Sequence, residues 1–204
     1  MRRTLAGTVV MLFVLPVLLA QDYRPSCTSC PATYIGNEEI QAYVTRAIAN
    51  RIVDQQVRAL DIGKPNVAVG IVHRGRLEAP APNSVAEHDL VSEVYHVIDG
   101  SGTLLTGPDL VDARRRPADN EAVRMLNGPG HNAASIRTPV THQLKAGDVV
   151  VIPAGTGHWF TKIDDHITYL MIRIDPDKVT PLKDEAASKA DLASLPRGRG
   201  GARQ

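Results

Sequence analysis

The sequence predicts a mainly β protein, a sandwich or barrel of short strands that follows one N-terminal α-helix. Two observations carry this prediction. Between about residues 63 and 176, short apolar segments alternate with glycine- and proline-containing turns, which is typical of all-β folds. Before them, apolar residues recur every three to four positions from Ile40 to Leu60, the spacing of one helix face.

The composition is that of an ordinary folded domain and excludes several classes of protein. Of the 204 residues, 43% are apolar and 22% are charged, so the chain is neither disordered throughout nor a multi-span membrane protein. The 23 lysines and arginines balance 22 aspartates and glutamates, so nothing indicates a nucleic-acid partner. The length suits one domain, or one domain with a tail.

Residues 1–20 have the pattern of a secretory signal peptide. Arg2 and Arg3 precede an apolar run from Leu5 to Leu19, and Ala20 supplies a small residue at the exit. The run is short for a membrane span, and a retained anchor is the alternative. We therefore predict an exported protein, periplasmic or secreted, with no membrane association once the peptide is cleaved.

Both cysteines lie in the next segment, residues 21–36, as Cys27-Thr-Ser-Cys30. No strand and helix flank them as in a thioredoxin-like site, and no second pair completes a zinc site. In an oxidising compartment, we expect a local disulfide or a redox-inert pair.

The helix is predicted over residues 37–62, with its periodic stripe at 38–60. Asn37 is the expected N-cap, two glutamates follow in the first turn, and Gly63 and Pro65 end the segment. The apolar stripe is expected to pack in the core or in a dimer interface.

Strands are predicted across residues 63–176. Alternation from Val67 to Ile71 indicates the first, and residues 93–99 are expected to turn at Gly-Ser-Gly 100–102 into a hairpin with 103–106. A polar stretch at about 107–134 is predicted to be a long loop, either a functional lid or a disordered insertion. Further strands are expected at 135–143, 148–152, 158–162 and 167–174.

A polar tail follows at residues 177–204. It could form a short helix at 184–195, and its last residues are rich in arginine and glycine. Because termini without apolar residues rarely dock, we expect the tail to be frayed.

Two segments place chemistry-bearing residues at a defined spacing. The first contains His88, Glu93 and Gly100, and the second contains Gly147, Pro153, Gly155 and His158. These residues resemble the two signature motifs of the cupin superfamily, G-x5-H-x-H-x(3,4)-E-x6-G and G-x5-P-x-G-x2-H-x3-N. The resemblance covers about residues 86–162.

The chain departs from the cupin motifs at three positions. The first motif lacks its opening glycine, where Pro80 stands, and its first histidine, where Ala86 stands. The first motif therefore matches only from its second histidine, His88, onward. The second motif ends at Lys162 instead of asparagine. Glu87 could replace the missing ligand, but strand alternation points it away from the His88 face.

The resemblance implies a jelly-roll barrel, also called a double-stranded β-helix, and a homodimer by default. In that barrel, His88, Glu93 and His158 would meet and hold a divalent transition-metal ion. Two imidazoles and one carboxylate suit iron, manganese, nickel, zinc or copper. Because cupin sites usually resemble three histidines plus one glutamate, the missing ligand either opens positions for substrate or weakens the site until no metal binds.

Tyr95 is the candidate catalytic residue, since it shares the strand face of Glu93. Near a metal, a phenol could act as general base, and the Glu-x-Tyr arrangement resembles cupin lyases that use a tyrosine to abstract a proton. The alternative is a tyrosine that only packs in the barrel mouth. His96 falls on the other face, and His131 and His142 are expected to be solvated loop residues.

We therefore predict an exported, metal-dependent cupin that acts on a small molecule by dioxygenase-type or by lyase- or isomerase-type chemistry. The alternatives are a non-catalytic barrel that binds a small molecule in the cell envelope, and a structural cupin whose long loop binds a partner.

Overall fold

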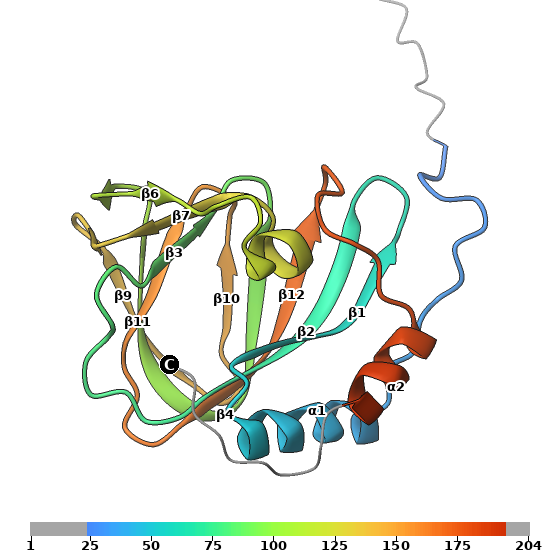
Figure 1. Ribbon diagram of the computed structural model, residues 1–204, viewed down its shortest axis with the longest axis horizontal. Coiled ribbons are helices and arrows are strands. Elements are labelled where there is room, and N and C mark those ends of the chain that lie inside the picture. The colour runs from blue at the N-terminus through green and yellow to red at the C-terminus, as the bar shows by residue number, and fades with distance from the viewer. Residues whose placement is uncertain (1–23, 195–204) are drawn as a thin grey trace, which may run out of the picture.

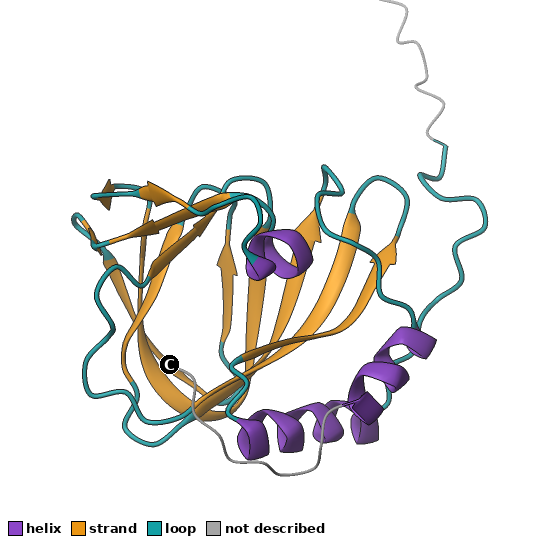
Figure 2. Cartoon of the chain, viewed as in Figure 1, coloured by secondary structure: helices purple, strands orange, loops and turns teal. Residues whose placement is uncertain are grey.

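Two antiparallel sheets curve around a shared core in the computed structural model of the protein, which describes residues 24–194 (Figure 1). Two helices lie on the outside of one sheet, at the lower right of the view (Figure 2). The mainly β jelly-roll barrel with an N-terminal helix is confirmed. The predicted signal peptide, residues 1–20, lies outside the described residues. Among the residues described, no helix is long and apolar enough to cross a membrane.

The first sheet contains five strands, and its edge strand, β1 (Asp54–Asp61), comes from the segment predicted to be helical. The strand order begins with β1 and β2 (Asn66–Arg74), and continues through β12 (Ile167–Asp175) to the first half of β4 (Ser92–Gly107). β10 (Val149–Ile152) pairs with the same half of β4. All these pairings are antiparallel.

The second sheet is built on the other half of β4. That half pairs with β9 (Val140–Lys145) and with β11 (Gly157–Lys162). β11 pairs with β3 (Val85–His88), and the order continues through β7 (Gly130–Ala133) to β6 (Arg114–Arg115). The predicted strands at 148–152, 158–162 and 167–174 are confirmed to within two residues, whereas β3 was not predicted.

The predicted helix over 37–62 is wrong in its second half. α1 spans Asn37–Asn50, Arg51 takes a left-handed conformation with φ 55°, and residues 54–61 form β1. The sequence misleads because β1 buries polar side chains that a helix would expose: Gln55, Gln56 and Arg58 are all buried. Arg58 is compensated by an ion pair with Glu39 of α1 at 2.8 Å.

The predicted hairpin at 100–102 is also wrong, because β4 runs through it without a turn. Gly100 has φ 76°, and a Cβ there would lie 2.1 Å from the carbonyl oxygen of His166. At this point β4 leaves β12 and β10 and joins β9 and β11. The glycine therefore lets one strand bend from the first sheet into the second.

The stretch at 107–134 is not a structureless loop. It contains β5 (Leu110–Val111), β6, a short π-helix η1 (Val123–Asn127) and β7, and β5 pairs with β8 (Ser135–Ile136). The predicted strand at 135–143 is correspondingly divided between β8 and β9. β7 and β6 extend the second sheet beyond β3.

The predicted tail docks on the barrel instead of fraying. α2 (Glu185–Ser194) packs beside α1, where Asp191 pairs with Arg46 at 3.0 Å and Ser188 is fully buried. Little in the sequence indicates this contact because, apart from Leu192, it is made mainly by polar side chains. Residues 195–204 lie outside the described residues.

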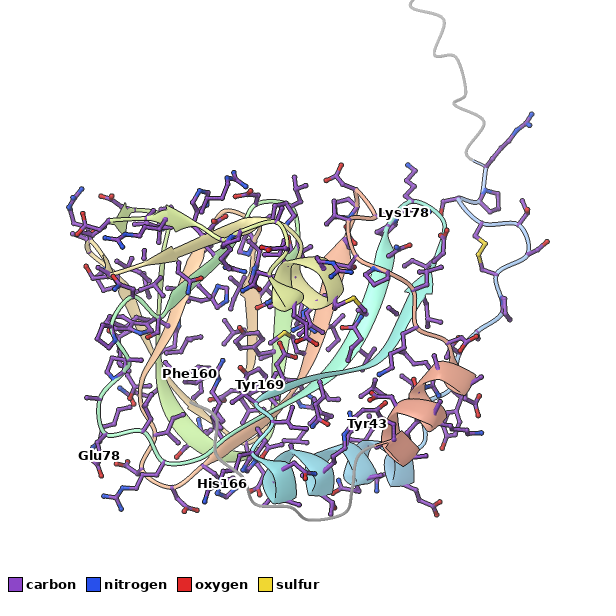
Figure 3. The ribbon with its side chains drawn as sticks, viewed as in Figure 1. Tyr43, Glu78, Phe160, His166, Tyr169 and Lys178 are labelled. Atoms are coloured by element: carbon purple, nitrogen blue, oxygen red, sulfur yellow. A yellow bond between two sulfur atoms is a disulfide. The ribbon has the colours of Figure 1, made fainter. Side chains whose placement is uncertain are left out.

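The main core fills the space between the two sheets. It includes Tyr95 and Val97 from β4, Tyr169 and Met171 from β12, and Phe160 from β11. In Figure 3 the labelled side chains of Phe160 and Tyr169 point into the barrel, and their ring centroids lie 5.9 Å apart. A smaller cluster beneath α1 contains Tyr43, Val57 and Ile71.

Candidate metal centre

Three predicted ligands meet inside the barrel although they come from three strands. His88 ends β3, Glu93 is the second residue of β4, and His158 is the second residue of β11. Their ligand atoms all lie within 4.8 Å of one another. Glu93 Oε1 is 3.3 Å from His88 Nε2, and Glu93 Oε2 is 3.5 Å from His158 Nε2.

The cluster is almost fully enclosed by protein. Glu93 is 1%, His88 3% and His158 8% exposed, and the two imidazole centroids lie 5.0 Å apart. Glu93 Oε1 has no hydrogen-bond partner among the described residues. A buried carboxylate oxygen that forms no hydrogen bond is unusual. Together with two imidazole nitrogens, it supplies the ligand atoms that a divalent transition metal prefers.

Electrostatics keep the glutamate charged and one histidine neutral. Burial would raise the pKa of Glu93, but His88, His158 and Arg173 together lower it below its usual value. Burial lowers the pKa of His158 to about 4. A carboxylate and a neutral imidazole are the forms in which these residues bind a cation.

The second nitrogens of the two histidines face different partners. His158 Nδ1 lies 3.1 Å from the carbonyl oxygen of Thr156, which accepts the Nδ1 proton and leaves the Nε2 lone pair directed inward. His88 Nδ1 instead faces the Arg116 guanidinium at 3.4 and 3.5 Å. Arginine can only donate, so this side of His88 lacks the acceptor that metal-binding histidines usually have.

A second arginine supports the glutamate from behind. Arg173 on β12 stands opposite Glu93 in the strand register, with its Nε 3.5 Å from Glu93 Oε1. Its other nitrogens bind Asp54, and Gln56 at 3.0 Å. Burial opposes the charge of Arg173, but Asp54 and Glu93 more than offset this and raise its pKa.

Tyr95 lies on the inner face with Glu93, as the strand alternation predicts. Its hydroxyl donates a 2.8 Å hydrogen bond to Glu93 Oε2, and its ring packs against Tyr169 with centroids 4.4 Å apart. Burial, followed by the charge of Glu93, raises its pKa well above the usual value. In this arrangement Tyr95 is a neutral phenol that holds the glutamate.

The cluster borders a cavity of about 250 Å³. Its walls also include Arg74, Asp54, Trp159 and Phe160. This volume is below the range of roughly 300–1,000 Å³ for sites that take drug-sized ligands, so the cavity suits a small molecule.

The position of the missing motif histidine lies in the same wall. Ala86 lines the cavity two residues before His88 and pairs with His158 across the strands. Glu87 points to the opposite face, where its carboxylate contacts His131 Nδ1 at 2.8 Å. The expectation that Glu87 does not replace the missing ligand therefore agrees with the structure.

The remaining histidines lie away from the cluster. His96 is exposed on the outer face of β4, as the alternation predicts. His131 is not the solvated loop residue expected, because it belongs to β7 and contacts Glu87 and Asp89. His142 lies on β9 and contacts the Thr106 hydroxyl at 2.9 Å.

Three arginines near the cluster were missed from the sequence: Arg74, Arg116 and Arg173. A signal existed for Arg173, because it alternates with Tyr169 and Met171 on one face of an otherwise apolar strand. Arg116 gave no comparable signal, since it lies in a polar run and reaches His88 only through the pairing of β6 and β7 beside β3.

Comparison with known proteins finds distant likenesses in structure only. No protein-family model matches the sequence, and no curated protein is significantly similar to it. A solved protein of Bacillus halodurans is 15% identical, with a TM-score of 0.40 over 78% of this chain and 96% of that one.

Two solved cupin proteins give similar values. One from Bacteroides fragilis is 18% identical, with a TM-score of 0.32 over 57% of this chain and 72% of that one. A cupin 2 conserved barrel domain protein from Salinispora arenicola is 13% identical, with a TM-score of 0.35 over 69% and 82%. The strand order and the motif residues of the chain itself remain the basis for describing its barrel.

Proposed function

We propose that this chain, a cupin-fold protein, binds one divalent transition-metal ion through His88, Glu93 and His158 and acts on a small molecule in the adjoining cavity. The observation that carries the proposal is the buried Glu93 carboxylate, whose Oε1 forms no hydrogen bond within the described residues and whose two oxygens each lie beside one imidazole Nε2 atom. Such an ion would supply oxygen chemistry if it is iron, nickel or copper, and Lewis-acid chemistry if it is zinc or manganese.

The protein's own residues divide the remaining tasks. Arg173 and Tyr95 hold the Glu93 carboxylate from two sides, and Thr156 fixes the orientation of His158. Trp159, Phe160 and the aliphatic part of the wall form the apolar side of the cavity. We propose Tyr95 as the group that exchanges a proton with the substrate, since it lines the cavity beside the three ligands.

The test is a measurement of metal content. The protein is purified without chelator and analysed by elemental mass spectrometry beside a His88→Ala/His158→Ala double variant. The matched control, His96→Ala/His142→Ala, removes two histidines outside the cavity. We expect about one transition-metal ion per chain in the native protein and in the control, and almost none in the first variant. Equal metal content in both double variants, or no uptake after reconstitution with iron, manganese, nickel, copper and zinc, would contradict the proposal.

Export and dimerisation belong to the same proposal. The signal-peptide pattern of residues 1–20 supports export to the periplasm or the medium. The disulfide between Cys27 and Cys30, visible as a yellow bond in Figure 3, suits an oxidising compartment. A homodimer is expected by analogy with cupins, and light scattering of the purified protein would test it.

The second candidate function is a non-catalytic barrel that binds a small molecule without metal. The missing motif histidine at Ala86 and the donor Arg116 behind His88 favour it. Such a protein would show thermal stabilisation by its ligand that a chelator does not change. A structural cupin would show neither effect.

A further inference from the structure

An arginine lines the same cavity as the candidate metal centre. Arg74 is the last residue of β2 and shares the inner face of that strand with Gly70 and Val72. Its guanidinium lies over the Phe160 ring, 5.3 Å from the centroid, and its Nε donates to the Tyr169 hydroxyl at 3.3 Å. Two aromatic residues therefore fix the guanidinium and leave its outer nitrogens for a ligand.

Arg74 forms no ion pair with any described residue, unlike its neighbour Arg173. The cavity wall contains two carboxylates, Asp54 and Glu93, and Arg173 contacts both. Asp54 attracts Arg74 electrostatically without forming an ion pair with it. Burial opposes the charge of Arg74, but Tyr169, Tyr95 and Asp54 more than offset this and raise its pKa, so the side chain is a cation.

The charges around the cavity indicate how a bound metal ion would add to the attraction that Arg74 exerts on an anion. Arg74 and Arg173 balance Asp54 and Glu93 in the protein itself. A divalent ion on Glu93 and two neutral histidines would leave an excess of two positive charges in a partly enclosed cavity. Charges in such a space interact more strongly than in water, so an anionic ligand would be favoured.

We propose that Arg74 binds the carboxylate of a small carboxylic acid whose other end carries an oxygen donor directed at the metal centre. The substrate class rests on the function proposed above, whereas the anion site rests on Arg74 alone. A guanidinium held at Nε presents two parallel N–H groups from Nη1 and Nη2, which match the two oxygens of a planar carboxylate. A cavity of about 250 Å³ with aromatic walls suits a short carbon chain between the two ends.

The test measures binding by calorimetry with four probes: butyrate, its neutral analogue butyramide, succinate and inorganic phosphate. Each is titrated into the zinc-reconstituted protein and into the chelator-treated protein. The variants are Arg74→Gln and Arg74→Lys, and Arg76→Gln is the matched control, because Arg76 is exposed and pairs with Glu78. Far-UV circular dichroism verifies that each variant is folded, and Arg74→Lys tests the site with its charge retained.

We expect butyrate to bind the chelator-treated protein, and butyramide not to bind. Arg74→Gln should weaken butyrate binding roughly tenfold to a hundredfold, Arg74→Lys should weaken it less, and Arg76→Gln should leave it unchanged. Zinc should strengthen the binding of succinate more than that of butyrate, because only succinate has a second oxygen group for the ion.

Other outcomes separate the two proposals. If carboxylates bind only with zinc and Arg74→Gln has no effect, the anion site is overturned while the metal centre stands. If zinc does not bind but butyrate still depends on Arg74, the metal function fails and the anion site is supported. Equal binding of butyramide overturns the charge argument, and tighter binding of phosphate than of butyrate overturns the carboxylate class.

Discussion

The buried ion pairs behind Glu93 are the residue-scale feature on which the site depends. Arg173 is 1% exposed and is shared by Asp54 and Glu93. A close approach makes this possible: a Cβ on Gly70 would lie 3.3 Å from Arg173 Nη1 and 2.9 Å from the Gln55 carbonyl oxygen. The glycine thus leaves room for the guanidinium to cross β2 and reach β1.

Arg173→Met should therefore destabilise the protein strongly, because it leaves the buried Glu93 and the half-buried Asp54 without their cation. We expect a loss of about 3–5 kcal/mol in the free energy of unfolding, measured by urea denaturation at neutral pH. Arg137→Met, which removes an exposed pair with Asp109, is the control and should cost less than about 1 kcal/mol. Similar losses for the two variants would refute the role given to Arg173.

The position of Arg116 beside His88 Nδ1 leads to a second prediction. Arg116→Gln replaces a cation with a side chain that can accept the Nδ1 proton of His88, and we expect metal affinity to rise roughly tenfold, measured by competition with a chromophoric chelator. Arg115→Gln is the control, because the neighbouring Arg115 pairs with Asp89 instead. Weaker binding in Arg116→Gln would mean that its bonds to the Glu87 and His131 carbonyls position His88.

The sequence allowed part of this site to be predicted. His88, Glu93, His158 and Tyr95 stood out because they combine a recognisable spacing with strand alternation, both of which are local properties. Arg74, Arg116 and Arg173 did not, because each acquires its role from a strand that is distant in the sequence. A charged residue can be buried only where a partner compensates it, and the order of strands in the sheet decides which partners are near.

At the scale of elements, the same division holds between local and long-range information. Alternation placed β2, and short segments bounded by glycine and proline placed β10, β11 and β12. Alternation failed for β1, whose polar residues are buried only because Glu39, Arg46 and Arg173 compensate them. It also failed for β4, because Gly-Ser-Gly favours a turn as readily as the bend that two sheets impose there.

The bend in β4 can be tested at its glycine. Gly100→Ala would place a Cβ against the His166 carbonyl at a positive φ, and we expect a loss of at least about 2 kcal/mol in the free energy of unfolding. Gly75→Ala is the matched control, since a Cβ there meets nothing within 4 Å. Thermal denaturation of both variants makes the comparison, and an unchanged midpoint for Gly100→Ala would be incompatible with the bend described.

The ends of β2 and β12 carry a pH-dependent contact. Hydrogen bonds to Asp99 at 3.0 Å and Asp165 at 2.7 Å raise the pKa of His166, whereas burial and the charge of His166 lower the pKa of the stacked His73. The His166 contacts therefore stabilise the fold below the ordinary histidine pKa, and this stabilisation is lost as pH rises through the raised value. His73 acts in the opposite direction, since it resists protonation as pH falls.

His166→Asn should remove the first contribution. We expect its melting temperature to fall below that of the native protein by a few degrees at about pH 6 and to match it at about pH 8.5. The effect stays small because both aspartates are exposed and screened by solvent. An equal decrease at both pH values would show that His166 stabilises the protein by packing and not by charge.

At the scale of the whole molecule, two helices from opposite ends of the chain join on one side of the barrel. Asp191 of α2 accepts bonds from Arg46 of α1 and from Lys183, and the Ser188 hydroxyl binds the Val57 carbonyl of β1. In Figure 2, α1 runs along the lower edge and α2 rises from its right-hand end. The contact joins the two helices to each other and to β1 of the first sheet.

Asp191→Asn should loosen α2 without changing the metal centre. We expect faster hydrogen exchange across residues 185–194 and a loss of about 1 kcal/mol in the free energy of unfolding, because the removed charge is partly exposed. Glu185→Gln, an exposed i,i+4 pair with Lys189 on the same helix, is the control. A reduced metal content in Asp191→Asn would indicate coupling between helix and cavity that the contacts do not predict.

The division of the ligands between the two sheets has a mechanical consequence. Glu93 belongs to the sheet that carries the helices, whereas His88 and His158 belong to the opposite one. An ion bound by all three would cross-link the two sheets. The sheets could then separate on unfolding only if the metal–ligand bonds broke. Binding and unfolding would then be one linked equilibrium, with the melting temperature rising as the logarithm of the free metal concentration.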